Sequence, residues 1–406
     1  MAGARLLAGR VALIVAGLLL GLAVAEAAAR ACGLGQSSMT RGMFFVFDPE
    51  AGKRCRPSAD LRFVQRGSFD VRVVCNSKGL RDREHELCKP AGARRLLCLG
   101  DSVTWGYGVE NSQMISARLE QELPGVETIN FGVAGYSALQ ELVRLESDGL
   151  AYDPDWTLVL FCDNDLDGNF DDHEASRPTV ELRDDGELHV RNRPVRESWI
   201  APALRFLHEH SRLVVESYYS LTLLRERRRE KATAERVVGS DEAAPAAVVH
   251  AAEPPSAPLA RRLTSADVRL SIVDRFVEPD ERIDQAWRTL QQIYAAMRDR
   301  IARHGSRLLV AYAPDPILAD RPSFLAALAQ SNVPPERADW DRPSRRVAQL
   351  CAELELPFVD LVPEFRAAKE PLALFLAANP HWSAAGTELA ATTIARRLRE
   401  LDERLR

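Results

Sequence analysis

The chain has 406 residues, which is enough for one large α/β domain with insertions or for two domains. Hydrophobic residues make up 46% and charged residues 27% of it, as in ordinary globular proteins, and the net charge of -5 provides no basic surface for nucleic acid. The seven cysteines show neither a CxxC pair nor the Cys/His spacing of a zinc site, so no metal and no cofactor is predicted.

Residues 11–29 form an apolar stretch that only Glu26 interrupts, and Arg5 and Arg10 precede it. Positive charges on that side keep the amino terminus in the cytoplasm and send the following chain across the membrane. Two interpretations stay open: a membrane anchor, because the helical pattern continues past Ala23-Val24-Ala25, or a signal peptide cleaved at those small residues. Both predict that the rest of the chain is extracytoplasmic, on the periplasmic side, with the membrane as a partner of the N-terminal segment.

Residues 33–93 are predicted to be extended and mostly irregular, with one strand at 68–74. Turn-forming residues at 76–79 follow that strand and lead toward the main domain. Two of the three cysteines in this region can form a disulfide outside the cytoplasm, but their spacing does not identify which two. These cysteines are Cys55, Cys75 and Cys88.

Strands and amphipathic helices alternate from residue 94 onward. The predicted strands are 95–99, 126–131, 156–162, 307–313 and 358–362. The predicted helices lie near 111–123, 138–148, 280–304, 343–354 and 384 to the end, the first with Asn111 as its cap. This alternation requires parallel pairing with right-handed crossovers, so the sequence predicts a three-layer αβα fold around a five-stranded parallel sheet.

A long insertion at 166–278 interrupts the alternation. It is predicted to hold a hairpin at 179–190, an amphipathic helical pattern at 199–230 and a disordered linker at about 237–260. The helical part is interpreted either as a lid over the site or as a surface decoration. The predicted organisation is therefore 1–32 as signal anchor or signal peptide, 33–93 as N-terminal region, 94–165 with 279–406 as main domain, and 166–278 as insertion.

The first strand of the main domain ends abruptly in Gly100-Asp101-Ser102. In parallel α/β sheets the functional sites lie at this end of the strands. A serine hydroxyl at that position can act as a nucleophile if a base removes its proton, whereas the structural alternative is that Asp101 and Ser102 only cap the next helix.

Other strand ends carry the remaining groups that acyl transfer requires. Glycines at 132 and 135 leave backbone N–H groups accessible, and the side chain of Asn164 can donate to a developing negative charge. His381 stands in a loop before the last helix, where it can serve as a base. All these groups are expected on one edge of the sheet.

In order and spacing, residues 100–102, 130–135, 164–165 and His381 resemble the blocks of the SGNH (GDSL-type) hydrolase family. The resemblance covers about 94–165 and 280–400. It is closest to membrane-anchored bacterial members, which share a lead-in like residues 76–82. It implies a flavodoxin-like sheet and ester hydrolysis or acyl transfer without a metal. It also implies roles for four residues: Ser102 as nucleophile, His381 as general base, and an oxyanion hole formed by the N–H of Ser102, the N–H of Gly135 and the side chain of Asn164.

Two positions depart from the family pattern. Cys162 replaces a glycine two residues before Asn164, and Asn379 stands where the triad aspartate is expected. Three alternatives stay open for the third member of the catalytic triad. Asn379 supports the histidine through its carbonyl, a carboxylate comes from elsewhere (Asp360 or Glu364), or the site is degraded.

The sequence thus predicts an extracytoplasmic serine ester hydrolase that acts on a small-molecule or polysaccharide ester. One alternative is an O-acyltransferase that modifies envelope polysaccharide. The other is a catalytically degraded protein that binds carbohydrate or assists assembly. The oligomeric state is not indicated.

Overall fold

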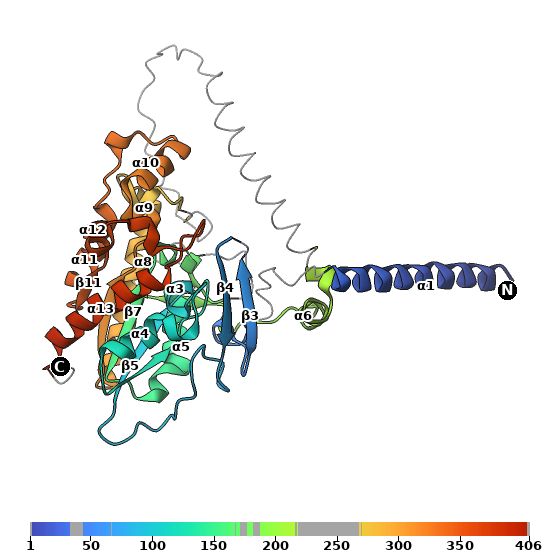
Figure 1. The fold of residues 1–406 in the computed structure, drawn as a ribbon, viewed down its shortest axis with the longest axis horizontal. Helices are drawn as coiled ribbons and strands as arrows, with labels where there is room; N and C mark the ends of the chain where they lie inside the picture. The colour runs from blue at the N-terminus through green and yellow to red at the C-terminus, as the bar shows by residue number, and fades with distance from the viewer. Residues whose placement is uncertain are drawn as a thin grey trace, which may run out of the picture. The chain divides into compact units, whose positions relative to one another are not determined.

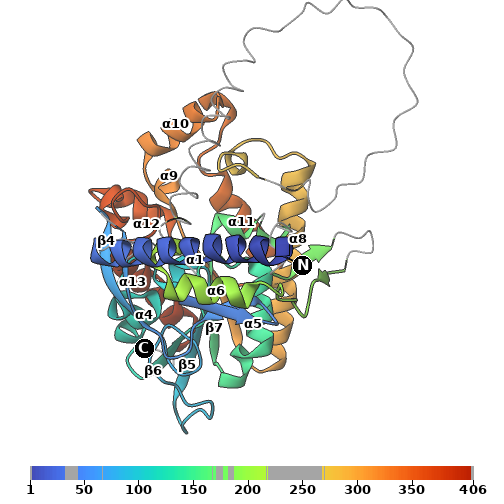
Figure 2. The same ribbon diagram turned by 90° about the vertical axis from the view of Figure 1, so that its right-hand side faces the viewer.

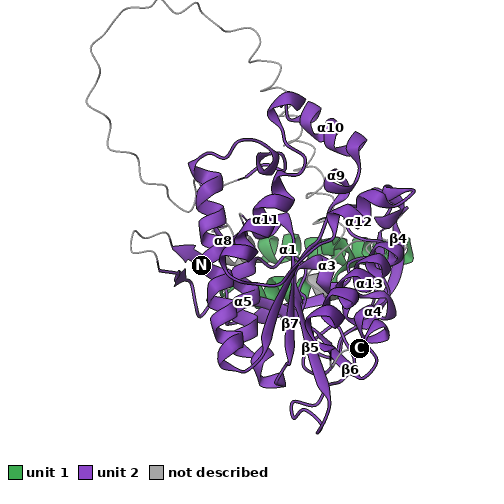
Figure 3. Ribbon diagram, turned by 90° about the vertical axis from the view of Figure 1, so that its left-hand side faces the viewer, with its two compact units in different colours: residues 1–43, 198–261 green, residues 44–197, 262–406 purple. Residues whose placement is uncertain are grey.

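The structure is a computed structural model, shown in Figure 1. It describes residues 2–32, 44–65, 67–166, 168–170, 177–181, 187–215, 217, 268 and 270–403. The chain divides into two compact units, residues 1–43 with 198–261 and residues 44–197 with 262–406 (Figure 3). Each unit is described by itself below.

The larger unit is built around a five-stranded parallel sheet. Its strands are β5 (Arg94–Gly100), β6 (Val126–Asn130), β7 (Trp156–Phe161), β10 (Arg307–Tyr312) and β11 (Phe358–Asp360). They pair in the order β11-β10-β7-β5-β6, which is the flavodoxin-like order 2-1-3-4-5. The predicted strands and the predicted αβα fold are therefore confirmed.

Helices cover both faces of the sheet, because its strands are continuous apolar runs. On one face α5 (Ala138–Ser147), α8 (Glu281–Arg303) and α11 (Arg342–Glu353) pack over one hydrophobic core. On the other face α4 (Ile115–Glu122) and α13 (Ala384–Leu401) pack over a second core, and Figure 3 shows the two layers on either side of the strands. Successive residues of β5 alternate between the cores, with Leu97 and Leu99 in the first and Leu96 and Cys98 in the second.

Short helices after β10 and β11 complete this unit. They are α9 (Pro316–Ala319), α10 (Arg321–Gln330) and α12 (Val362–Ala367), each with proline in its first turn, and the sequence analysis did not predict them. Asn111 is not the helix cap that was predicted. A 3₁₀ turn begins there, capped by Glu110, because the Asn111 amide instead exchanges hydrogen bonds with the backbone of Val74 (2.8 and 3.3 Å).

The N-terminal part of this unit is more regular than predicted. Where one strand was expected, two antiparallel hairpins form: β1 (Phe45–Asp48) with β2 (Gly52–Cys55), and β3 (Asp60–Gln65) with β4 (Phe69–Val74). Cys55 and Cys75 are buried there as free cysteines, and the Cys55 sulfur accepts the Trp105 indole N–H at 3.2 Å, whereas Cys88 is exposed.

The insertion is partly described. Its predicted hairpin is confirmed as β8 (Thr179–Glu181) paired with β9 (His189–Arg191). The turn at 184–186, the predicted linker at 237–260 and most of the predicted helix at 199–230 lie outside the described residues. Of that helix, the structure shows α6 (Ala201–His210) and a short helical stretch at 212–215.

The smaller unit contains α1 (Ala2–Ala31) and α6, blue and yellow-green in Figure 2. Within α1, residues Gly9–Ala31 are long and apolar enough to cross a membrane, and they lie near the N-terminus, where signal sequences show the same properties. The finding agrees with both interpretations of the N-terminal segment.

His85 gives the larger unit a pH-dependent stability. Its Nδ1 lies 2.7 Å from Glu127 Oε1 and its Nε2 3.2 Å from Asp82 Oδ2. Burial lowers the pKa of His85, but hydrogen bonds and charges from Asp82 and Glu127 outweigh burial and raise the pKa above 6.5. The folded state therefore holds this proton more tightly than the unfolded chain does. The resulting stability is fully present below about pH 6.5 and is lost as pH rises through the raised pKa.

Thermal unfolding from about pH 6 to pH 9 tests whether stability falls as pH rises. The wild-type midpoint is expected to fall relative to that of His85→Gln as pH rises. A constant difference between the two proteins would show that His85 does not bind its proton more tightly in the folded state.

Candidate active site

Ser102 lies at the carboxyl end of β5, on the first turn of helix α3 (Ser102–Trp105). Asp101 caps this helix, since its Oδ1 accepts the Val103 N–H at 3.0 Å. Asp101 therefore caps the next helix, as the structural alternative for Gly100-Asp101-Ser102 predicted, but it also has contacts beyond this cap. The other carboxylate oxygen of Asp101 accepts the Asn164 side-chain amide at 3.1 Å and lies 3.2 Å from Ser102 Oγ. Asp101 therefore joins the ends of β5 and β7.

Arg81 and Asp82, in the segment before the main domain, fix the neighbouring loops. Arg81 is fully buried and donates to the carbonyl of Trp105 (3.1 Å), at the end of α3, and to that of Val109 (2.6 Å), in the loop that follows. Burial lowers the pKa of Arg81 to about 10, so its guanidinium stays charged at neutral pH. Asp82 accepts the backbone N–H of Asn130 at 2.8 Å, at the end of β6.

His381 reaches Ser102 from the opposite end of the chain. Its Nε2 lies 2.7 Å from Ser102 Oγ. The loop that carries it is closed by a bridge between Phe375 and Trp382, and by the Leu376 N–H donating to the His381 carbonyl at 2.8 Å. The ring of Tyr107 stacks on the imidazole, with centroids 3.9 Å apart and planes at 12°, so the ring orientation is fixed from the side as well.

Asn379 supports the imidazole through its carbonyl oxygen. Its Oδ1 lies 2.6 Å from His381 Nδ1 and accepts the backbone N–H of His381 at 3.0 Å. A backbone N–H can only donate, so the Asn379 atom that faces His381 is the oxygen. Nδ1 must then carry the proton, and Nε2 is left as an acceptor for the Ser102 hydroxyl.

Gln65, the last residue of β3, holds the other half of that amide. The Asn379 Nδ2 donates to Gln65 Oε1 at 2.9 Å, which opposes rotation of the amide. Ala378 has a φ of +52°, a left-handed conformation that turns the chain directly before Asn379. A chain of contacts thus runs from Gln65 through Asn379 and His381 to Ser102.

The two carboxylates considered as substitutes for a triad acid have other partners. Asp360 accepts the Val362 N–H at 3.0 Å, and Glu364 pairs with Arg396 at 3.0 Å. Neither contact involves His381, so the structure gives no support to a triad acid from β11 or α12. Asn379 is the group that it places beside the imidazole.

Three donors were predicted for an oxyanion hole. Among the described residues, neither the Ser102 nor the Gly135 backbone N–H donates to another protein group. Gly135 has a φ of +74°, and a Cβ there would lie 3.3 Å from Lys53 Nζ, so other residues are disfavoured. The Asn164 amide carries two N–H donors, of which Asp101 takes one.

Gly132, by contrast, serves packing. Its N–H donates to Asn130 Oδ1 at 2.9 Å, and a Cβ on it would lie 2.4 Å from the backbone nitrogen of Trp105. The loop after β6 therefore lies directly against the helix that carries Ser102.

The structure has room for the side chain of Cys162, which replaces the glycine of the family pattern. Its thiol lies 3.3 Å from Asp101 Oδ1, so it adds a donor to the carboxylate that holds Ser102. Two further carboxyls, Glu141 and Asp165, are buried nearby, and burial together with the charge of Asp101 raises the pKa of both.

Asp163 and Asp165, on either side of Asn164, make contacts within the protein. Asp163 pairs with Arg275 and accepts the Tyr312 hydroxyl at 2.8 Å, and Asp165 accepts the Cys162 N–H at 3.0 Å. No cluster suited to a metal occurs among the residues that the structure describes. The ion pair with Arg275 instead holds the loop on which Asn164 stands.

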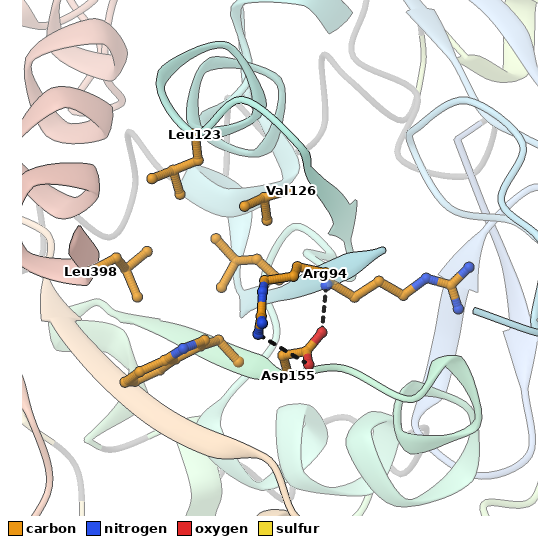
Figure 4. Close-up of a pocket in the computed structure, with 8 residues that line it drawn as sticks. Arg94, Leu123, Val126, Asp155 and Leu398 are labelled. Atoms are coloured by element: carbon orange, nitrogen blue, oxygen red, sulfur yellow. Dashed lines mark hydrogen bonds and ion pairs between the residues drawn. The ribbon is translucent and has the colours of Figure 1, made fainter. Parts of the chain in front are cut away.

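A small pocket lies at the other end of the strands. Figure 4 shows it among Arg94, Val126, Asp155 and Leu398, where Asp155 accepts the Arg95 N–H at 2.8 Å. Ser102 follows the carboxyl end of β5, whereas this pocket lies at its amino end, so the pocket is not part of the site.

Sequence reasoning missed Gln65 and Tyr107. Tyr107 lies only five residues after Ser102, so the short spacing was a signal that its side chain stays near Ser102. Gln65 gave none, since it meets Asn379 only through the packing of the β3–β4 hairpin.

The chain was compared with known families and structures. The family model described as "GDSL-like Lipase/Acylhydrolase family" matches residues 98–389. Curated protein sequences give no significant match.

Solved structures give weak likenesses only. TesA has 13% identity and a TM-score of 0.36, over 76% of this chain and 100% of that chain. A lipase/acylhydrolase from Enterococcus faecalis has 15% identity and a TM-score of 0.35, over 76% and 96%. A variant of an acetyl xylan esterase from Geobacillus stearothermophilus has 15% identity and a TM-score of 0.35, over 76% and 95%.

At these scores the family model alone carries the assignment. It spans well over half of the chain and confirms the resemblance noted in the sequence. The protein therefore belongs to the GDSL-like lipase/acylhydrolase family, and so to the hydrolases that act on esters.

Proposed function

We propose that this protein is a serine ester hydrolase that works outside the cytoplasm through an acyl-enzyme on Ser102. The observation that carries the proposal is the 2.7 Å contact between His381 Nε2 and Ser102 Oγ, the distance expected for a general base and its nucleophile. The expected substrate is an ester of a small molecule or of a polysaccharide.

The proposed reaction has two similar halves. His381 Nε2 takes the hydroxyl proton as Ser102 Oγ attacks the ester carbonyl carbon, whose π electrons move onto the carbonyl oxygen. When this oxyanion collapses, the C–O bond to the alcohol breaks and the alcohol takes the proton from His381. Water then attacks the acyl-enzyme with the same base, so that the carboxylic acid leaves and Ser102 is restored.

The oxyanion formed in each half is expected to be stabilised by three donors, the Ser102 N–H, the Gly135 N–H and the Asn164 amide. Donors that are fixed in place before the reaction stabilise the charge without reorganising. The contacts from Asp101 and the Arg275–Asp163 pair support this proposal, because they hold Asn164 on a rigid loop.

The neutral amide of Asn379, in place of the triad aspartate, is compatible with the proposed acyl transfer. When asparagine replaces the aspartate of a serine protease, much of the loss of about 10⁴ in kcat comes from the wrong imidazole tautomer. Here the Asn379 oxygen faces Nδ1, which supports the productive tautomer. What the amide lacks is the negative charge that stabilises the imidazolium.

The extracytoplasmic placement rests on α1. The helix is long and apolar enough to span a membrane, and Arg5 and Arg10 lie at its amino end. That charge asymmetry supports a cytoplasmic amino terminus with the hydrolase part on the periplasmic side.

Asn164→Ala tests the oxyanion assignment with the purified full chain and p-nitrophenyl acetate. Loss of one oxyanion donor is expected to lower kcat by about 10²–10³-fold with little change in KM, because the donor acts on charge that develops in the transition state. A folded variant with unchanged kcat would remove Asn164 from the mechanism.

A further inference from the structure

Helix α6 and Trp199, two residues before it, expose large apolar side chains. Trp199 is 90% exposed, Phe206 60%, Leu204 56% and Leu207 46%. Single exposed apolar residues are common, but an exposed tryptophan and phenylalanine together with two leucines within nine positions form a contiguous apolar surface. Such a surface normally has a partner.

The end of α6 is attached to the end of the apolar helix α1. Arg30 Nη2 donates to the His210 carbonyl at 2.6 Å, at the last residue of α6. Glu26 accepts the Ser211 hydroxyl at 2.8 Å and the backbone N–H groups of Arg212 and Leu213, each at 3.0 Å. These contacts explain the one carboxylate in the apolar stretch, since it binds the first N–H groups of the helical residues that follow α6.

The length of α1 places these contacts at a membrane surface. The 23 residues Gly9–Ala31 extend about 34 Å as a helix, slightly more than a hydrocarbon core of about 30 Å. With Arg10 at the cytoplasmic boundary, Arg30 lies about 30 Å further along the helix, at the opposite boundary, and its partner Glu26 lies about one helical turn deeper. The attached end of α6 must lie at the same depth.

We propose that Trp199 and α6 form a second membrane-binding surface, which lies in the headgroup region on the periplasmic side. The partner is the lipid bilayer that contains α1. Tryptophan is enriched at this depth, and phenylalanine and leucine side chains insert into the boundary between headgroups and acyl chains. Trp199 and α6, which follow the anchor by about 170 residues, thereby form a second attachment to the same membrane. The proposal depends on membrane insertion of α1 and not on the catalytic assignment.

Tryptophan fluorescence of the full chain tests this proposal. The protein is reconstituted into phosphatidylcholine/phosphatidylglycerol vesicles, with either ordinary or dibrominated acyl chains. The emission of Trp199 is obtained by subtracting the spectrum of Trp199→Phe from that of the wild type. It is expected at short wavelength in ordinary vesicles, and most of it is expected to be lost in brominated vesicles, because bromine quenches only fluorophores in contact with acyl chains.

Trp340 provides the matched control. Its Nε1 donates to the Ile317 carbonyl at 2.8 Å and the Arg366 guanidinium lies 3.6 Å from its ring, so this side chain is packed within the protein. Its difference signal, obtained with Trp340→Phe, is expected to be the same in both kinds of vesicle. Phe206→Glu places a charge on the apolar surface and is expected to restore much of the Trp199 emission in brominated vesicles.

Equal Trp199 emission in ordinary and brominated vesicles would overturn the proposal. Added acrylamide then identifies the true environment, since it quenches a water-exposed tryptophan and spares one that is covered by protein. Loss of hydrolase activity in any of these variants has no bearing on the result.

Discussion

Ser102→Ala is expected to lower kcat for p-nitrophenyl acetate by about 10⁴-fold or more, because no other group can form the acyl-enzyme. The 2.7 Å contact with His381 supports a hydroxyl positioned against the proposed base, so removal of the Ser102 Oγ atom should abolish the proposed acyl transfer. The measurement is steady-state hydrolysis by the purified full chain, corrected for hydrolysis in buffer.

The control for this variant is its stability. Ser102 Oγ contacts His381 Nε2 at 2.7 Å and Asp101 Oδ2 at 3.2 Å, and the loss of these contacts should change thermal unfolding only slightly. A folded Ser102→Ala protein with wild-type turnover would exclude the acyl-enzyme and leave any esterase activity to another site.

Asn379 is expected to give the second largest effect, and its variants should act in opposite directions. Asn379→Ala removes the acceptor at Nδ1, so the productive tautomer is no longer selected, and kcat should fall by about 10²–10⁴-fold. Asn379→Asp keeps an acceptor in the same place and adds the missing charge, so kcat should match or exceed that of the wild type.

The pH profile separates this role from a merely structural one. A carboxylate beside the imidazole favours its protonated form, so Asn379→Asp should move the acid limb of kcat/KM to higher pH. Gln65→Ala should lower kcat less than Asn379→Ala does, because it only frees the amide to rotate, whereas Gln65→Glu keeps an acceptor for Asn379 Nδ2. An acid limb that stays in place in Asn379→Asp would contradict the assignment.

Much of the fold was predictable from the sequence, because each central strand is an apolar run and each crossover helix has one apolar face. The same regularity predicted that Ser102, Asn164 and His381 lie on one edge of the sheet, since parallel strands present their carboxyl ends together. The β8–β9 hairpin was predictable from a local turn signal.

The features that could not be predicted depend on tertiary contacts, which produce no local pattern in the sequence. Asn111 resembles a helix cap in sequence, but the backbone of Val74 competes successfully for its amide. Strands β1, β2 and β3 are short and irregular in sequence, and their pairing is fixed by packing of aromatic residues such as Phe63 and Trp105. The orientation of the Asn379 amide is set by Gln65, a residue 314 positions away.

The contact between Ser102 and His381 favours an enzyme over a binding protein that has only kept the fold. The most direct test is covalent labelling of the folded full chain with a fluorophosphonate probe, followed by mass spectrometry of the labelled peptide. We expect one adduct per chain, on Ser102, which is absent from Ser102→Ala and strongly reduced in His381→Ala. No adduct on the folded wild-type protein, or an adduct on a different residue, would contradict the proposal.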